Sequence, residues 1–166
     1  KKFGTSSLLV ANATSDYISV PSSSEFGFGT SAYTIELYIR PSADGITGTK
    51  TLIDFRDSTS DNTHGVLYLS AGQIKYDVGG TNLVNSGLVT LNNDTWYYIA
   101  IQRSSTASNG LSLIIDGAQA GQGTDATNYP AKGIRIGANA AAADGFDGHI
   151  DEIRVSASSR YSTIPF

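Results

Sequence analysis

The stretch YTIELYIR, residues 33–40, is the part of the sequence that decides the fold. Its residues Tyr33, Ile35, Leu37 and Ile39 alternate with threonine, glutamate, tyrosine and arginine. A period of two places the two sets of side chains on opposite faces of a strand. We therefore expect a β-strand here with one face in a hydrophobic core, rather than a helix with a period near 3.6.

Short runs of the same kind recur along the chain, at residues 51–55, 66–70, 73–78, 96–102, 111–115, 134–136 and 149–155. Turn-forming pairs such as Gly79-Gly80 and Asp116-Gly117 separate them. Regular short strands joined by such turns predict an antiparallel sandwich or barrel. The alanine-rich stretch 137–144 is too short for an independent helix, so we expect a surface loop or single turn there. With no linker or repeat in the sequence, one domain over residues 1–166 is predicted.

The composition indicates a neutral polar surface, because 40% of the residues are hydrophobic and only 16% are charged. A net charge of −4 with scattered basic residues predicts no nucleic-acid partner. No apolar run approaches the length of a membrane helix, so no membrane insertion is expected. Without cysteine, the fold has neither disulfides nor thiolate metal ligands. The absence of methionine leads us to expect a processed product or a part of a longer protein.

Seven phrases occur in a recognisable order: FGTSSL (3–8), DYISVP (16–21), FGT (28–30) with the strand at 33–41, NDTWYYIAIQR (93–103), LIIDG (113–117), FDGHIDEIRV (146–155) and RYSTIPF (160–166). Together they resemble laminin-G-like domains of the concanavalin A-like lectin/glucanase superfamily. The resemblance implies an all-β, antiparallel two-sheet jelly-roll sandwich. The last phrase is similar to the ending of phage and marine bacterial members, so we expect an extracellular or virion-surface location.

Several of these motif residues have structural interpretations. Trp96, at the start of a predicted strand, is expected to fill the core between the sheets. Asp116-Gly117 predicts a hairpin turn, in which glycine takes a positive φ. Gly148 predicts a close approach or a bulge, because the apolar phase changes across Asp151-Glu152.

Calcium is the expected cofactor, and it comes from the resemblance. Many members of the superfamily tie the closing strand to the first hairpin with a structural calcium, which by motif position implicates Asp151 together with Asp16. Hard oxygen ligands of this kind suit calcium. The alternative is that Asp151 holds the bulge by hydrogen bonds and binds no metal.

Ligand-binding residues are predicted on loops, where specificity resides in such folds. The polar cluster of Asp54, Arg56, Asp57 and Asn62, near Asp61, follows a strand and forms either a ligand or calcium rim or a salt-bridged loop. Aromatic rings can stack on sugars, with amides and carboxylates near the sugar hydroxyls. This adds Tyr76 and Asn82 as predicted ligand-binding residues. Further candidates with the same chemistry are Tyr38, Tyr97, Tyr129, Asp77, Asn128 and Asn139. For each tyrosine the alternative is packing within or between the sheets.

The sequence predicts no enzyme. Glycosidases of this fold need two carboxylates facing one sugar, and the chain lacks their Glu-x-Asp-x-x-Glu run. Asp151 and Glu152 are adjacent, so an ordinary strand would direct them to opposite faces. Neither His64 nor His149 has a neighbour at zinc-ligand spacing.

Two functions follow from these observations. The first is a non-catalytic glycan-binding or adhesion module of a phage appendage or secreted surface protein, with carbohydrate as the partner. The second is a structural or assembly domain of a virion, such as a knob, fibre or decoration domain. That role predicts a homo-oligomer or binding to other virion proteins instead of sugar.

Overall fold

The computed structural model describes residues 1–11 and 16–161, and strands dominate it. Its elements are β1 (Leu8–Val10), β2 (Ile18–Ser23), η1 (Ser24–Phe26), β3 (Tyr33–Pro41), η2 (Asp44–Ile46), β4 (Thr49–Asp54), β5 (Gly65–Ser70), β6 (Gln73–Val78), β7 (Thr81–Asn85), β8 (Tyr97–Arg103), β9 (Leu111–Ile115), β10 (Ala118–Gly123), β11 (Lys132–Ile136) and β12 (Gly148–Ser156). No helix in this part of the chain is long and apolar enough to cross a membrane.

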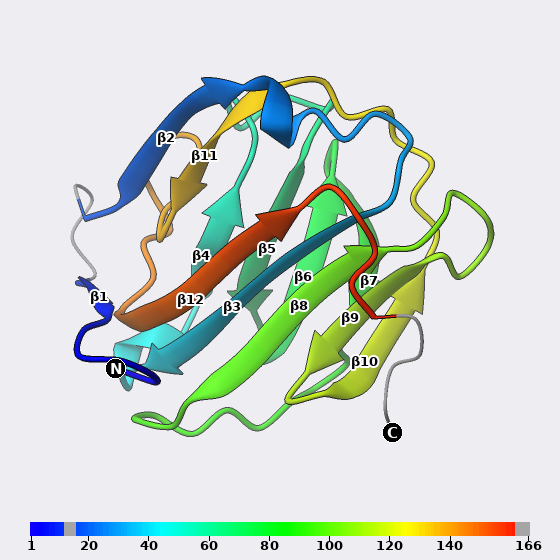
Figure 1. Cartoon of the computed structure of the whole chain (residues 1–166). Helices are drawn as coiled ribbons and strands as arrows, with labels where there is room; N and C mark the ends of the chain where they lie inside the picture. The colour runs from blue at the N-terminus through cyan, green and yellow to red at the C-terminus, as the bar shows by residue number, and fades with distance from the viewer. Residues whose placement is uncertain (12–15, 162–166) are drawn as a thin grey trace.

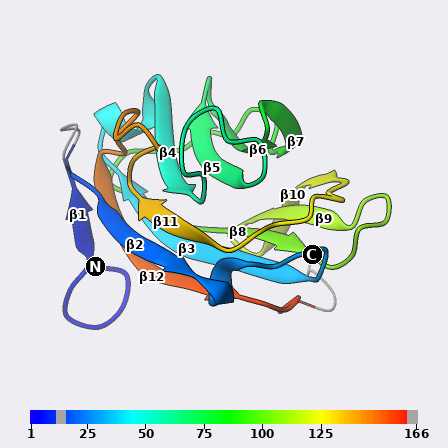
Figure 2. The ribbon, with the colours of Figure 1, turned by 90° about the horizontal axis from the view of Figure 1, so that it is seen from above.

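The strands form two six-stranded antiparallel sheets (Figure 1). Sheet A has the order β1-β12-β3-β8-β9-β10, and sheet B has the order β2-β11-β4-β5-β6-β7. Figure 2 shows β4 to β7 on one side of the molecule and β3, β8 and β9 on the other. The structure therefore confirms the predicted two-sheet jelly-roll sandwich.

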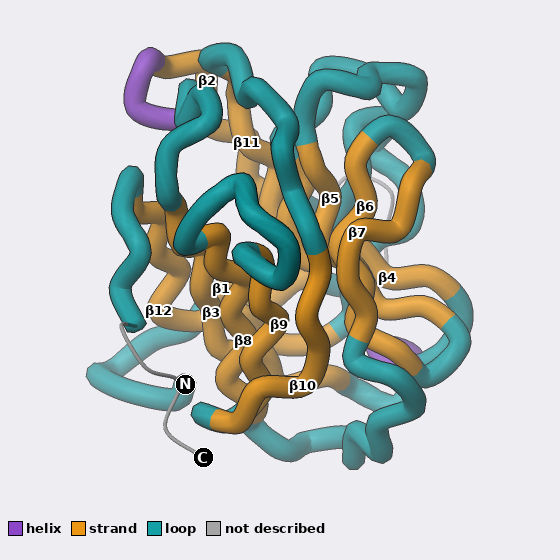
Figure 3. Tube along the Cα trace, turned by 90° about the vertical axis from the view of Figure 1, so that its right-hand side faces the viewer, coloured by secondary structure: helices purple, strands orange, loops and turns teal. Residues whose placement is uncertain are grey.

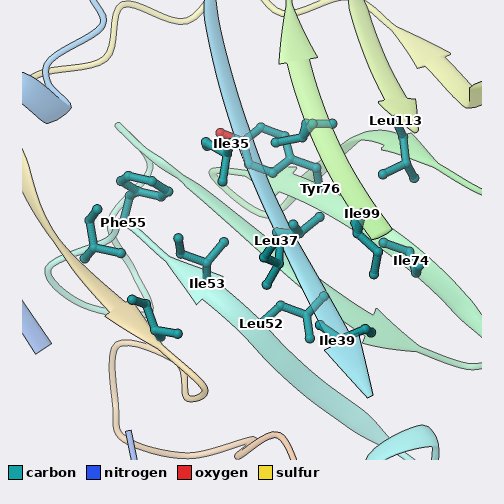
Figure 4. Close-up of a cluster of buried hydrophobic side chains, with 14 of the residues drawn as sticks. Ile35, Leu37, Ile39, Leu52, Ile53, Phe55, Ile74, Tyr76, Ile99 and Leu113 are labelled. Carbon is teal, nitrogen blue, oxygen red and sulfur yellow. The ribbon is translucent and has the colours of Figure 1, made fainter. Parts of the chain in front are cut away.

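The core lies between the two sheets and contains the inward-facing apolar side chains of the strands (Figure 4). From β3 it takes Ile35, Leu37 and Ile39, all completely buried. Ile35 and Leu37 pair with Ile101 and Ile99 of β8. The apolar face of residues 33–40 thus forms the centre of the core, as its period of two predicts.

Two strands that the sequence did not reveal, β7 and β10, lie at one edge of the sandwich. They contact each other across the two sheets (Figure 3). The backbone of β7 comes so close that a Cβ on Gly121 would lie 2.2 Å from the Asn85 carbonyl oxygen, and one on Gly123 would lie 2.0 Å from that of Leu83. Glycine is required in β10 for this approach, which explains why its sequence AQAGQG lacks the usual composition of a strand.

A charged pair is buried at one end of the core. Both side chains of Arg103 and Asp125 are inaccessible to solvent, and their Nη1 and Oδ2 atoms lie 3.2 Å apart. Arg103 also donates to the carbonyl oxygens of Gly29, Ser31 and Thr127 at 2.7–3.1 Å. These bonds satisfy the buried guanidinium and fix two loops to the sandwich.

The turn and bulge predictions are confirmed. Asp116 and Gly117 have φ values of 49° and 85° in the β9–β10 hairpin. The β12–β3 register shifts between Asp151 and Arg154, and Glu152 has a φ of 51°. A Cβ on Gly148 would lie 2.3 Å from the Arg40 carbonyl oxygen, so this glycine does mark a close approach.

The prediction for Trp96 is wrong. Its side chain is only partly buried and lies before β8, with its ring centroid 6.3 Å from that of His149. The next residue, Tyr97, has the inward phase of β8 and is buried in the core. By contrast, residues 137–144 form a loop, as expected, against the end of β4.

Candidate functional site

The outer face of sheet B carries a hollow of about 160 Å³. We call it the sheet-B hollow. Its floor comes from β4, β5 and β6, and its rim from the loops that follow β4, β6 and β11. It is lined by Thr49, Thr51, Arg56, Val66, Tyr68, Asp77, Gly80, Asn139 and Asp144.

Tyr68 supplies an aromatic ring to this hollow because it lies at a position of β5 whose side chain faces outward. Its neighbours Leu67 and Leu69 point into the core, and Tyr68 is only partly buried. Its hydroxyl donates to Asp77 Oδ2 at 2.7 Å, while Asn82 Nδ2 donates to Asp77 Oδ1 at 2.7 Å. Burial, together with the bond to Asp77, raises the pKa of Tyr68, so the hydroxyl stays protonated. The ring is therefore held in one orientation.

Arg56 is held at the rim by Asp54. The Arg56 side chain donates to both carboxylate oxygens of Asp54, from Nε at 2.9 Å and Nη2 at 2.8 Å. Asp54 also accepts backbone bonds from Arg56 and from Ala140. The hydrogen bond to Asp54 raises the pKa of Arg56. Asp54 is buried beneath the rim, so this predicted residue positions Arg56 and the 137–144 loop.

Asn139 organises that loop on the other side of the hollow. Its side-chain oxygen accepts backbone bonds from Ala141 and Ala143, and its Nδ2 donates to Asp144 Oδ2 at 2.7 Å. The backbone of Asp144 in turn accepts from Thr51 of β4 at 2.8 Å. The two carboxylates of the hollow, Asp77 and Asp144, are thus both held by amide side chains.

The remaining predicted rim residues form a neighbouring cluster on the loop after β4. Asp57 and Asp61 form ion pairs with Lys132 of β11. Burial would raise the pKa of Asp61, but bonds from Thr63 and Asp57 outweigh it and hold this pKa below its usual range. Asn62 is exposed and packs against Gly79. The structure therefore supports a salt-bridged loop for Asp57, with Arg56 directed into the hollow.

Tyr76 is wrongly predicted as a ligand-binding residue. Its ring is completely buried in the core, and its hydroxyl donates to the Tyr129 hydroxyl at 3.4 Å. The inward phase that Tyr76 shares with Ile74 and Val78 explains its position. Tyr97 and Tyr129 are also buried. Of the predicted residues, Arg56, Asp77 and Asn139 line the hollow. Asp54 and Asn82 hold Arg56 and Asp77 in place. The sequence analysis missed Tyr68 and Asp144.

The two residues predicted for calcium have different surroundings. Asp151 Oδ2 accepts from the backbone nitrogens of Lys2 and Phe3 at 2.8 and 3.3 Å, and Oδ1 accepts from that of Glu152 at 2.9 Å. Burial would raise the pKa of Asp151, but these three bonds lower it overall. Asp16 lines a separate hollow beside β1 with Leu8–Val10, Tyr17 and Ile18.

These surroundings favour the alternative role of Asp151, in which it holds the bulge by hydrogen bonds. Its oxygens already accept backbone hydrogen bonds, and residues 1–11 and 16–161 contain no group of three acidic, histidine or cysteine side chains placed to hold a metal. The geometry is that of the alternative interpretation, in which Asp151 holds the bulge and the N-terminal segment. Calcium stays a prediction.

The fold places the chain among known domains. The sequence matches the family model of the concanavalin A-like lectin/glucanases superfamily over residues 12–162. No curated protein matches the sequence.

Similar solved structures include mouse laminin α1 domains LG4-5 (TM-score 0.64, 13% identity, 95% of this chain, 44% of that chain). The CBM40 of the Ruminococcus gnavus IT-sialidase has a TM-score of 0.62 at 12% identity, covering 88% of this chain and 92% of that chain. The receptor-binding domain of botulinum neurotoxin C/D mosaic serotype has a TM-score of 0.66 at 16% identity, covering 90% and 39%.

This chain thus spans less than half of the laminin and toxin chains. At these identities the structural likeness shows the fold. Because the family model extends over most of the sequence, the chain belongs to the concanavalin A-like lectin/glucanases superfamily.

Proposed function

We propose that this domain is a non-catalytic glycan-binding module and that the sheet-B hollow is its binding site. The observation that carries the proposal is the Tyr68 ring, which stands beside Asp77, Arg56, Asn139 and Asp144 in one hollow. An aromatic face packs on the C–H groups of a sugar, while carboxylates, amides and arginine meet its hydroxyls.

The size and charge of the hollow narrow the ligand class. At about 160 Å³ it is smaller than the roughly 300–1,000 Å³ of drug-sized pockets, so it suits one sugar residue or the end of a chain. The charge of Arg56 is neutralised by Asp54, and Asp77 and Asp144 are both acceptors for hydroxyl groups. We therefore propose a neutral, hydroxyl-rich saccharide.

The comparisons support this proposal. Two similar structures are named as a carbohydrate-binding module and as a receptor-binding domain. The resemblance of residues 160–166 to phage and marine bacterial endings supports a phage appendage or secreted surface protein as the parent, at the virion surface or outside the cell. Residues 162–166 lie outside the described part of the chain.

A glycan array followed by calorimetric titration, with and without calcium, tests the function. We expect binding of neutral saccharides that Tyr68→Ala removes and Tyr68→Phe largely retains, because the ring supplies the stacking surface. Thermal unfolding of each variant checks that it folds. Binding unchanged in folded Tyr68→Ala would reject the site, and no saccharide binding at millimolar concentration would reject the function.

Two alternatives have their own tests. Asp77 and Asp144 share one hollow, so incubation with the bound saccharide would reveal hydrolysis if they acted as a glycosidase pair. A structural or assembly domain of a virion would instead form a defined oligomer or a protein complex. Light scattering across concentrations, with recovery of partners from the parent particle, would detect it.

A further inference from the structure

The outer face of sheet A carries a second hollow, of about 470 Å³. We call it the sheet-A hollow. It is lined by Lys2, Tyr38, Tyr98, Asp116, Gly117, Arg154 and Tyr161. These residues come from the N-terminal segment, β3, β8, the β9–β10 turn, β12 and the segment after β12, so no element of sheet B contributes.

Its aromatic wall is held rigidly. The rings of Tyr38 and Tyr98 lie 5.2 Å apart with an interplanar angle of 52°, and Phe3 packs edge-on against Tyr38 at 5.4 Å. The hydroxyls of Tyr98 and Tyr161 donate to Glu36 Oε2 at 2.7 and 2.5 Å. Because Glu36 is buried in the sheet face, it fixes both rings before any ligand binds.

Cations border this wall. Lys2 Nζ lies 5.2 Å from the centroid of the Tyr38 ring. Arg154 forms an ion pair with Glu36, with Nε 2.5 Å from Oε1, and its side chain is 56% exposed, so part of the guanidinium faces the solvent. Among the residues that line the hollow, the carboxylate is that of Asp116, which accepts the backbone N–H of Tyr98 at 2.8 Å. The exposed Glu152 lies nearby, since, besides burial, both carboxylates contribute to raising the pKa of Tyr38.

The side chains that line the two hollows therefore differ in the sign of their net charge. The sheet-B hollow presents Asp77 and Asp144 with an arginine that is already paired. The sheet-A hollow is lined by two cationic side chains, Lys2 and Arg154, and one carboxylate, Asp116. Arg154 is paired with the buried Glu36, as is Arg160. A sugar hydroxyl suits the first arrangement, whereas the second favours an anionic group close to an aromatic face.

We propose that the sheet-A hollow is a second binding site, for a saccharide that carries a carboxylate, with its ring against Tyr38 and Tyr98 and its carboxylate near Lys2 and Arg154. This site shares no residue with the sheet-B hollow. The proposal consequently stands or fails independently of the function proposed for sheet B.

Titration of the whole chain with digalacturonic acid and with its neutral dimethyl ester, followed by two-dimensional NMR, tests the proposal. We expect the acid to shift resonances around the sheet-A hollow and the ester to bind more weakly. Tyr38→Ala should weaken acid binding about tenfold, which corresponds to the 1.4 kcal/mol of a truncated contact residue. Lys2→Gln should weaken it about twofold to fivefold and reduce its salt dependence.

Tyr68→Ala is the matched control, because it removes an outward tyrosine from the other sheet. We expect it to leave digalacturonic acid binding unchanged. Equal affinity for acid and ester, no detectable binding of the acid, or binding lost in Tyr68→Ala but kept in Tyr38→Ala would each overturn the proposal. If Tyr38→Ala does not fold, Lys2→Gln decides, since Lys2 is exposed.

Discussion

His64 makes the stability of this domain sensitive to mildly acidic pH. It is completely buried, with its ring stacked on that of Phe55 at 4.9 Å and tilted against that of Tyr129 at 4.5 Å. Gly65 donates its backbone N–H to Nδ1 at 3.0 Å, and Nε2 lies 3.3 Å from the carbonyl oxygen of Phe26. The neutral ring protonated on Nε2 satisfies both bonds. A second proton on Nδ1 would oppose the N–H of Gly65.

Burial lowers the pKa of His64 from 6.5 to about 4, although the bond to Phe26 acts in the opposite direction. Between these two values the unfolded chain binds the extra proton and the folded chain does not. Stability is therefore fully present above pH 6.5 and is lost as the pH falls toward 4. The expected loss in the free energy of unfolding is about 2 kcal/mol between pH 7 and pH 5, and about 3 kcal/mol over the whole range.

Urea unfolding at pH 7, 6 and 5 measures this loss. His64→Gln removes the titrating group, so its free energy of unfolding should change little over the same range even if the variant is less stable at pH 7. His149→Gln is the control, because His149 lies on the partly exposed outer surface, where Ser7 bonds to it. An equal pH dependence in wild type and His64→Gln would refute the reasoning.

Three further predictions concern the other buried or shared polar contacts. Arg103→Met leaves Asp125 buried without its charge partner, which should lower the free energy of unfolding, measured in urea, by about 3–5 kcal/mol. Arg160→Met is the control at a partly exposed arginine and should lower it by less than about 1 kcal/mol. Gln102→Ala removes the side-chain carbonyl oxygen that accepts hydrogen bonds from the backbone nitrogens of Arg160 and Tyr161 at 2.8 and 2.9 Å. The amide hydrogens of Arg160 and Tyr161 should therefore exchange with deuterium faster in the variant. Exchange rates that the substitution leaves unchanged would contradict this role of Gln102. Asp151→Ala should lower the midpoint of thermal unfolding equally in calcium and in EDTA, because it removes the hydrogen bonds to the backbone of Lys2 and Phe3. A midpoint that calcium raises in the wild type but not in the variant would instead establish the predicted metal site.

The alternation of short segments allowed most of the fold to be predicted. Residues 33–40 identify β3 because their inward side chains are all apolar. The same rule, applied to residues 73–78, would have placed Tyr76 inside with Ile74, and applied to residues 65–70 it would have exposed Tyr68. Tyrosine occurs on both faces of these strands, so its position in the alternation, and not its residue type, predicts whether it is buried.

Other features depend on contacts between distant segments and have no local signal. The Asp54 carboxylate meets the Ala140 backbone because β11 pairs with β4, a strand order that no short stretch specifies. Likewise, β10 is a strand because its glycines fit against β7, and its own composition favours a loop. The sequence could therefore indicate Arg56, Asp77 and Asn139 as separate candidates but could not predict that Asp144 lines the same hollow.

The central claim is that the sheet-B hollow binds a neutral saccharide. NMR titration of the isotopically labelled chain with lactose, maltose and cellobiose tests it most directly, because each backbone amide reports its own surroundings. We expect at least one sugar to shift amides of β4, β5, β6 and residues 137–146, and Tyr68→Ala to abolish these shifts. Shifts confined to other surfaces, or no shifts with any neutral sugar at millimolar concentration, would contradict it.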